Sequence, residues 1–272
     1  MRIAISNIAW DVFEDEKISE LLSQYQIDAI DIAPGKYFPD PTKVTDCDIS
    51  KIRAYWEAKG IEITGMQSLL FGKPKLNVFG SVEVQQLMLN HLNAVARIAA
   101  GLGIKRLVFG SPRNRNRKGL SDKQSFYIAK NFFTKLGNIA NQHKVIFCLE
   151  PNPVCYGANF MTNSKVTFDV VSAVNHPAIK MQLDTGSIIL NKESISEVIR
   201  YSKNQIGHIH ISEPGLEVIG DIDNQHTEFA KVIKSNLKNA LATVEMIATQ
   251  NESHIISIER ALSFVTQTYR AS

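Results

Sequence analysis

The chain has 272 residues, of which 44% are hydrophobic and 21% charged, and its formal net charge is +3. This composition is ordinary for a globular protein and excludes collagen-like, coiled-coil and disordered chains, while so small a charge does not by itself predict a nucleic-acid partner. No apolar run reaches the roughly 18 residues of a membrane span, and the opening stretch MRIAISNIAWDVFEDE turns acidic too early for a signal peptide, so we expect a cytoplasmic protein without a membrane partner.

Short β-rich runs alternate with longer amphipathic stretches along the chain. The runs are mostly β-branched or apolar and are bounded by turn or polar residues, which is typical of buried strands. The predicted strands are residues 3–7, 29–33, 61–67, 104–110, 145–150, 179–184, 206–211 and 254–259. The predicted helices, with apolar residues at helical spacing, are residues 16–24, 49–59, 82–102, 122–142, 164–175, 194–203, 227–249 and 261–269.

The alternation predicts the fold class. Strands joined by helical crossovers form a parallel sheet, and eight such units in a chain of this length are typical of a (β/α)8 TIM barrel. The alternative is an open doubly wound sheet, but no G-x-G-x-x-G motif follows the first predicted strand. We see no linker-like segment, so residues 1–272 are expected to form a single (β/α)8 barrel domain.

The last four predicted strands end on polar side chains that share one face. Side chains of a strand alternate between two faces, and in each of these strands one set of alternate residues is apolar and suited to packing under helices. Because ligands bind at the C-terminal ends of barrel strands, we expect the last polar residue of each strand to converge at the mouth of the barrel. These residues are Glu150, Asp184, His210 and Glu259.

This set of side chains predicts a metal site. Three carboxylates facing one interior repel one another unless a positive charge lies between them. Carboxylate oxygens with one imidazole suit Mn²⁺, Mg²⁺, Co²⁺ or Zn²⁺, and without a thiolate ligand the choice stays open. We therefore predict one divalent metal ion as the cofactor. The alternative for each residue is a polar strand end that only bonds to the backbone.

The same strand ends carry a family resemblance. The segments CLEPNP, MQLDTGSI, HIHISEP and SIER resemble the metal-binding strand ends of the xylose-isomerase-like barrel superfamily. That superfamily includes sugar-phosphate isomerases and epimerases, ketose 3-epimerases, inosose dehydratases and AP endonucleases. The resemblance implies a metal ligand at Glu150, Asp184, His210 and Glu259, and it implies that Glu150 and Glu259 also form the catalytic acid/base pair.

The chain also departs from the family pattern. Ser187 stands where relatives usually have a histidine that helps to bind substrate, and Pro214-Gly215 stand where many have an arginine. In the AP endonuclease branch histidines occupy the places of Ser187 and Ser68, so that activity is not expected. Ser187 is therefore a candidate substrate contact of an unusual kind.

Other candidate substrate contacts lie at strand ends and in loops. Gln67 ends the third predicted strand, Trp10 follows the first, and Glu213 and His226 follow the seventh. A sugar often rests against an aromatic ring such as that of Trp10, although core packing is the alternative. Glu213 could instead be a surface acid, and His226 could instead begin a helix.

A basic loop follows the fourth predicted strand. Residues 104–121 contain six lysines or arginines and no acid. Guanidinium groups match phosphate geometry in a bidentate manner, so Arg113 and Arg115 are predicted to hold an anionic group of the substrate. The alternative is a solvated basic loop.

Together these features predict a divalent-metal-dependent sugar or sugar-phosphate isomerase/epimerase that works by proton abstraction through an enediolate. The alternatives are a sugar or keto-acid dehydratase on the same site and a non-catalytic carbohydrate-binding barrel. The expected partner is a small sugar or sugar phosphate, with no nucleic acid and no membrane. Assembly into a homo-oligomer stays open.

Overall fold

The computed structural model describes residues 1–222 and 225–270, which form a closed barrel of eight parallel strands. The strands are β1 (Arg2–Ser6), β2 (Ala29–Ile32), β3 (Glu62–Met66), β4 (Arg106–Phe109), β5 (Ile146–Leu149), β6 (Ile179–Asp184), β7 (Ile206–Ser212) and β8 (Leu241–Glu245). They pair in chain order, and pairing of β1 with β8 closes the sheet on itself. The predicted TIM barrel is therefore confirmed.

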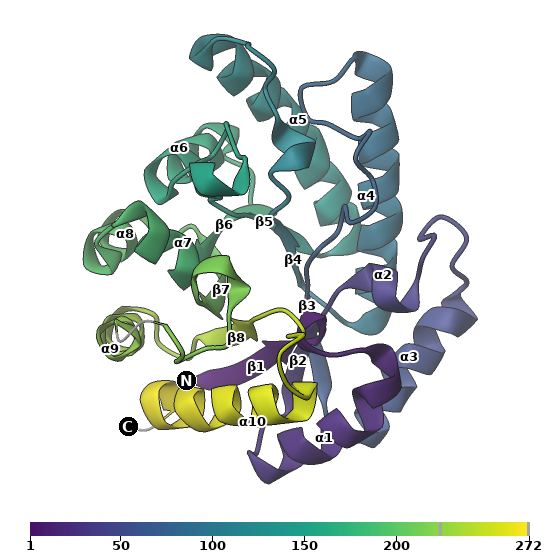
Figure 1. Ribbon diagram of the computed structural model, residues 1–272. Helices are drawn as coiled ribbons and strands as arrows, with labels where there is room; N and C mark the ends of the chain where they lie inside the picture. Colours follow the sequence, from purple (N-terminus) through teal and green to yellow (C-terminus); the bar gives the residue numbers. More distant parts are fainter. Residues whose placement is uncertain (223–224, 271–272) are drawn as a thin grey trace.

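Helices surround the barrel and link its strands (Figure 1). They are α1 (Asp15–Gln24), α2 (Pro34–Tyr37), α3 (Asp46–Ala58), α4 (Val82–Leu102), α5 (Asp122–His143), α6 (Ser164–Val174), α7 (Thr185–Asn191), α8 (Ile195–Ser202), α9 (His226–Asn236) and α10 (His254–Val265). No helix among the described residues combines the length and the apolar character that crossing a membrane requires.

The two longest helices show why the sequence predicted their bounds well. The side chain of Ser81 caps the first turn of α4, and Gly103, with a φ of 84°, ends that helix in the left-handed conformation that glycine adopts without strain. Ser121 and Gln124 form a reciprocal capping box at the start of α5. These helix-end signals involve residues that are close together in the chain, so they can be recognised from the sequence alone.

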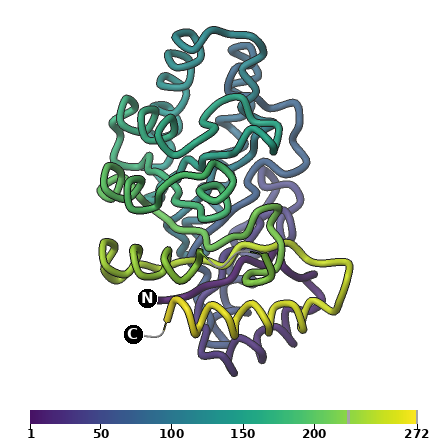
Figure 2. The backbone as a smooth tube through the Cα atoms, turned by 60° about the vertical axis from the view of Figure 1, so that its left-hand side comes forward, coloured from purple at the N-terminus to yellow at the C-terminus, as the bar shows by residue number. Residues whose placement is uncertain are grey.

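The first strand, β1, and the end of α10 lie next to each other, as both backbone views show (Figures 1 and 2). Helix α10 packs against α1, and a π-helical turn, Thr266–Arg270, follows it. The guanidinium of Arg270 donates hydrogen bonds to the carbonyls of Tyr25 and Gln26, 2.8 and 2.9 Å away. These contacts hold the last described turn beside the first β/α unit.

The prediction of a strand at residues 254–259 is wrong, because this segment opens α10. The eighth strand is β8, which lies inside the range predicted as one helix, 227–249. The buried residues of α10 include Ile258, Ala261, Leu262 and Val265, whose spacing is that of a helix face and not of a strand. Glu259 is consequently exposed on the outer surface, far from a strand end.

Candidate metal centre and active site

Four side chains from neighbouring strand ends converge at the mouth of the barrel. Glu150 follows β5, Asp184 ends β6, His210 lies in β7 and Glu245 ends β8. One ligand atom from each lies within 4.8 Å of the others. The His210 Nδ1 atom is 3.0 Å from Glu245 Oε2 and 3.4 Å from Glu150 Oε1. The structure therefore brings together Glu150, Asp184 and His210, with Glu245 in the place predicted for Glu259.

Hydrogen bonds fix the Asp184 carboxylate. Its Oδ1 atom accepts from the backbone N–H of Ser187 at 2.6 Å, and its Oδ2 atom accepts from the Ser212 hydroxyl at 2.6 Å. Asp184 is also the N-cap of α7, so the strand end and the helix start hold it together. Burial, and after it the neighbouring charge of Glu150, raises the pKa of Asp184.

Glu245 is held from two sides. Its Oε1 atom accepts a 2.6 Å hydrogen bond from Gln67 Nε2, which reaches across from the end of β3. Its Oε2 atom contacts His210 Nδ1. Burial lowers the pKa of His210, but Glu245 and Glu150 outweigh burial, so the pKa lies well above its usual value. The two carboxylates thus favour the protonated form of the His210 imidazole.

The donor set fits a divalent cation. Glu150 Oε1 is buried and makes no hydrogen bond within residues 1–222 and 225–270. A carboxylate oxygen left buried without a donor is costly, and a cation among these four side chains would satisfy it. Three carboxylates and one imidazole are ligands that Mn²⁺, Mg²⁺, Co²⁺ and Zn²⁺ accept.

The backbone around Glu150 is held by a buried arginine. The Arg115 guanidinium donates to the carbonyl of Glu150 at 2.6 Å and to that of Gly110 at 3.3 Å, and the side chain has no exposed area. Burial lowers the pKa of Arg115 to about 10, and the charge of Glu150 opposes this shift. A Cβ atom at Gly110 would lie 2.1 Å from Glu150 Oε2, so the absence of a side chain there makes room for the carboxylate.

A cavity of about 360 Å³ opens at the barrel mouth, and three of the four side chains, Glu150, Asp184 and Glu245, line it. Its volume is at the small end of the range for ligand pockets, which is roughly 300–1,000 Å³. Hydroxyl and amide groups line the cavity next to apolar side chains. Four carboxylates also line it: Glu150, Asp184, Glu213 and Glu245. The polar lining includes Gln67, Ser68, Ser111, Asn152, Ser187 and Ser212, and the apolar lining includes Leu70, Phe71, Val108, Pro112 and Leu216.

Three of the predicted substrate contacts line this cavity: Gln67, Ser187 and Glu213. The hydroxyl of Ser187 donates to the carbonyl of Pro151 at 2.9 Å, so it also ties the β5 loop to α7. Whether these residues contact a substrate stays a prediction.

Two other predicted contacts lie outside the cavity. Trp10 is wholly buried, and its indole N–H donates to Asp15 at 2.7 Å, so the core-packing alternative is correct for this residue. His226 begins α9 and is also wholly buried, 2.6 Å from the hydroxyl of Tyr269 and 3.3 Å from Glu213. It touches a residue of the cavity wall without reaching the cavity itself.

The basic loop does not supply a cation to the cavity wall. Arg115 is enclosed by its own backbone partners, so the prediction that it holds a substrate phosphate is wrong. Arg113 is exposed in the same 3₁₀ turn, Arg113–Arg115, and is not among the residues that line the cavity. The solvated alternative describes Arg113.

Glu245 is the residue that sequence reasoning missed. It ends the run LATVE, in which apolar and polar residues alternate as in a strand with one inward face. The signal was short and lay inside a longer amphipathic stretch. Ser212 and Asn152 carry no such signal. Ser212 hydrogen-bonds to Asp184 of the neighbouring strand, and Asn152 hydrogen-bonds to Glu150, two positions earlier in the loop after β5.

Solved structures of similar fold include sugar epimerases. A D-psicose 3-epimerase from Clostridium cellulolyticum H10, solved with D-tagatose, superposes with a TM-score of 0.82 and 18% identity over 99% of both chains. An L-ribulose 3-epimerase gives a TM-score of 0.83 and 14% identity, over 99% of this chain and 94% of its own. The IOLI protein with a bound zinc atom gives 0.75 and 14%, over 99% and 98%. At these identities the likeness shows the fold.

The family described as xylose isomerase-like TIM barrel matches residues 20–260, which is most of the chain. No curated protein matches the chain in sequence. The chain belongs to the xylose isomerase-like TIM barrel family.

Proposed function

We propose that this protein is a divalent-metal-dependent sugar isomerase or epimerase. The observation that carries the proposal is the convergence of Glu150, Asp184, His210 and Glu245 under a cavity of monosaccharide-scale volume. Sugar 3-epimerases share the fold over nearly the whole chain, which supports the same assignment.

In this proposal Glu150 and Glu245 move the proton. Both carboxylates border the cavity and contact His210. One removes a proton from the carbon beside the substrate carbonyl, and the other returns a proton, which yields the isomer or the epimer. Asp184, fixed by Ser187 and Ser212, serves as a ligand only. A divalent cation at this site would polarise the substrate carbonyl and stabilise negative charge on its oxygen.

The charge of the cavity supports an unphosphorylated substrate. Within the described part of the chain no lysine or arginine lines it, whereas Glu150, Asp184, Glu213 and Glu245 do. A phosphate would bring two further negative charges to this wall without a guanidinium or ammonium partner, and recognition of phosphate normally uses one. The hydroxyl and amide groups of the wall suit the hydroxyls of a neutral sugar.

Solvent deuterium uptake tests the proposal. The protein is incubated in D₂O with Mn²⁺ or Co²⁺ and a panel of free and phosphorylated ketoses and aldoses, and the products are read by NMR. We expect deuterium at the carbon next to the carbonyl of an unphosphorylated sugar. Chelation should stop the exchange, and added cation should restore it.

Other results would redirect the assignment. Exchange confined to phosphorylated sugars would contradict the neutral-substrate part of the proposal. Loss of a hydroxyl along with exchange would identify a dehydratase. Absence of exchange in every sugar, with the cation bound, would contradict the enzyme assignment and favour a carbohydrate-binding barrel.

A further inference from the structure

A second carboxylate lies one layer deeper in the barrel and takes no part in the proposed reaction. Asp31 of β2 has no exposed area. Its Oδ2 atom accepts from His208 Nε2 at 2.6 Å and from the Thr243 hydroxyl at 2.8 Å, and its Oδ1 atom accepts from the Thr64 hydroxyl at 2.9 Å. Three different strands, β3, β7 and β8, thus supply donors to one carboxylate.

The backbone also leaves space for this group. A Cβ atom at Gly65 would lie 2.4 Å from each carboxylate oxygen of Asp31, so a larger residue there would displace the carboxylate. Burying a carboxylate is costly even when it is hydrogen-bonded. Three side-chain donors and the space left by Gly65 accommodate this carboxylate, which indicates a role beyond filling the barrel interior.

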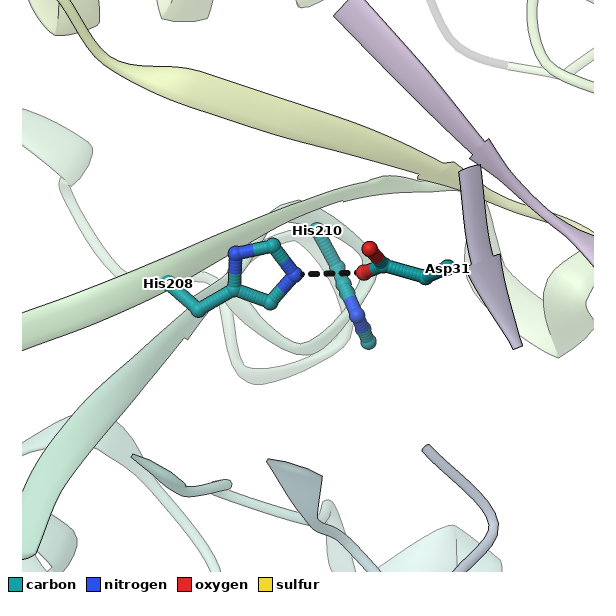
Figure 3. Close-up of side chains that lie close together, drawn as sticks. All are labelled: Asp31, His208 and His210. Carbon is teal, nitrogen blue, oxygen red and sulfur yellow. Dashed lines mark hydrogen bonds and ion pairs between the residues drawn. The ribbon is translucent and has the colours of Figure 1, made fainter. Parts of the chain in front are cut away.

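The neighbouring residue whose orientation Asp31 could fix is His210. Figure 3 shows the Asp31 carboxylate facing the ring of His208, with the ring of His210 close by. One ring nitrogen of each histidine and one oxygen of Asp31 lie within 4.8 Å of one another, and the two rings cross at 77° with centroids 5.3 Å apart. His210 therefore belongs both to this group and to the carboxylates at the barrel mouth.

The two nitrogens of His210 face different surroundings. Nδ1 contacts Glu245 and Glu150 at the mouth. Nε2 is buried and makes no hydrogen bond to any residue that the structure describes. When Nδ1 binds a cation, Nε2 must carry the ring proton, and that proton needs an acceptor. A histidine that ligates a metal usually donates its other N–H to a carboxylate or carbonyl, which orients the ring.

We propose that Asp31 is a positioning residue for the metal-loaded protein: its carboxylate, grouped with His208 and His210 within 4.8 Å, would accept the Nε2–H of His210 once Nδ1 binds the cation, and would so keep Nδ1 directed toward the barrel mouth. His208, Thr64 and Thr243 hold the carboxylate in place for this contact. The inference rests on the proposed metal site but concerns a residue outside it.

Cobalt binding tests the role of Asp31. Asp31→Asn keeps the size of the side chain and removes its charge. We expect the Co²⁺ dissociation constant to rise by about 10–100-fold, the usual effect of losing such a partner, and the visible Co²⁺ spectrum to change because the imidazole turns. Unchanged affinity and spectrum would reduce Asp31 to a structural role.

Asp15→Asn is the matched control. Asp15 is another buried aspartate, 5% exposed, with hydrogen bonds from Trp10 and Tyr37 and no ligand of the proposed site in contact. It should lose stability while keeping the affinity for Co²⁺ and its spectrum. An equal loss of affinity in both variants would mean that general destabilisation is the cause, and would overturn the proposal.

The wild-type protein provides a second test that does not depend on a variant folding. In the Zn²⁺-loaded protein, nitrogen-15 NMR of the histidine rings should show the metal on Nδ1 of His210 and a slowly exchanging proton on Nε2. Metal on Nε2 would contradict the proposal, and so would two bound ions per chain, because the second would occupy Asp31, His208 and His210. Failure of the wild type to bind any cation would instead refute the proposed metal site itself.

Discussion

Arg115 has a charge typical of substrate recognition, yet its side chain is buried and hydrogen-bonds to the protein's own backbone. Its neighbours in the sequence, Arg113 and Arg117, are at least partly exposed, while Arg115 is wholly buried with its donors on the carbonyls of Glu150 and Gly110. Composition cannot distinguish the three arginines. The difference arises because only Arg115 faces the end of β5, 35 positions later in the chain.

The first prediction compares two arginines of this loop. Arg115→Met should lower the free energy of unfolding by about 1–3 kcal/mol, because two partly buried carbonyl acceptors lose their donors. Arg113→Met, at the exposed position of the same turn, should change it by no more than about 0.5 kcal/mol. Urea unfolding followed by circular dichroism measures both. Similar values for the two variants would contradict the structural role of Arg115.

The second prediction concerns pH. The pKa of His210 lies well above its usual value, against the effect of burial, because of Glu245 and Glu150, and burial raises the pKa of Asp184. Both shifts mean that the metal-free site holds protons that a cation must displace. Affinity for Co²⁺ should therefore rise as the pH increases through neutrality, and fall as the pH drops. Calorimetry in two buffers of different ionisation enthalpy should detect about one proton released per ion at pH 7. Affinity that is independent of pH, with no proton released, would rule out His210 as a ligand.

At the scale of elements, the sequence predicted the strands β5 to β7 closely but assigned the last strand and the last helix wrongly. The strands β5 to β7 were predicted within about two residues, because each is a short run with alternate apolar residues that leads to Glu150, to Asp184 or through a His-x-His motif. The stretch HIISIE is also a short isoleucine-rich run that leads to a glutamate, but it lies in α10. Its helical spacing emerges only when Ala261, Leu262 and Val265 are read together with Ile258.

The third prediction tests this assignment directly. As a strand, residues 254–259 would bury Ile256 and Ile258 on the same face, whereas in α10 Ile256 is 55% exposed and Ile258 fully buried. Ile258→Ala should thus lower the free energy of unfolding by about 2–4 kcal/mol, and Ile256→Ala by about 0.5 kcal/mol or less. Thermal and urea denaturation of the pair provide the comparison. Large, equal losses at both positions would be the signature of a strand and would contradict α10.

Long-range partners explain the rest of what the sequence could not predict. Asp31 meets His208 and Thr243 across 177 and 212 positions, and Gln67 meets Glu245 across 178. No local sequence pattern predicts these pairings, because each depends on how the strands are arranged once β8 closes the barrel against β1. The predicted site residues that the structure brings together, Glu150, Asp184 and His210, are those whose strands could be read from local alternation.

At the scale of the whole molecule, closure of the barrel assembles the site. The four converging side chains come from β5, β6, β7 and β8, and Gln67 reaches them from β3. No pair of adjacent elements holds the complete set, so the site depends on the register of half of the barrel. This arrangement agrees with the general location of active sites in TIM barrels, at the C-terminal ends of the strands.

The central claim is that Glu245, and not Glu259, is the partner of Glu150 in proton transfer. Its most direct test is the rate of solvent deuterium uptake into a reactive sugar by Glu245→Gln and Glu259→Gln, each loaded with the same cation. Glu245→Gln should exchange about 10²–10⁴-fold more slowly than the wild type, the usual contribution of a general base. Glu259→Gln, on the exposed face of α10, should exchange at the wild-type rate. The reverse pattern, with exchange lost in Glu259→Gln and kept in Glu245→Gln, would contradict the account.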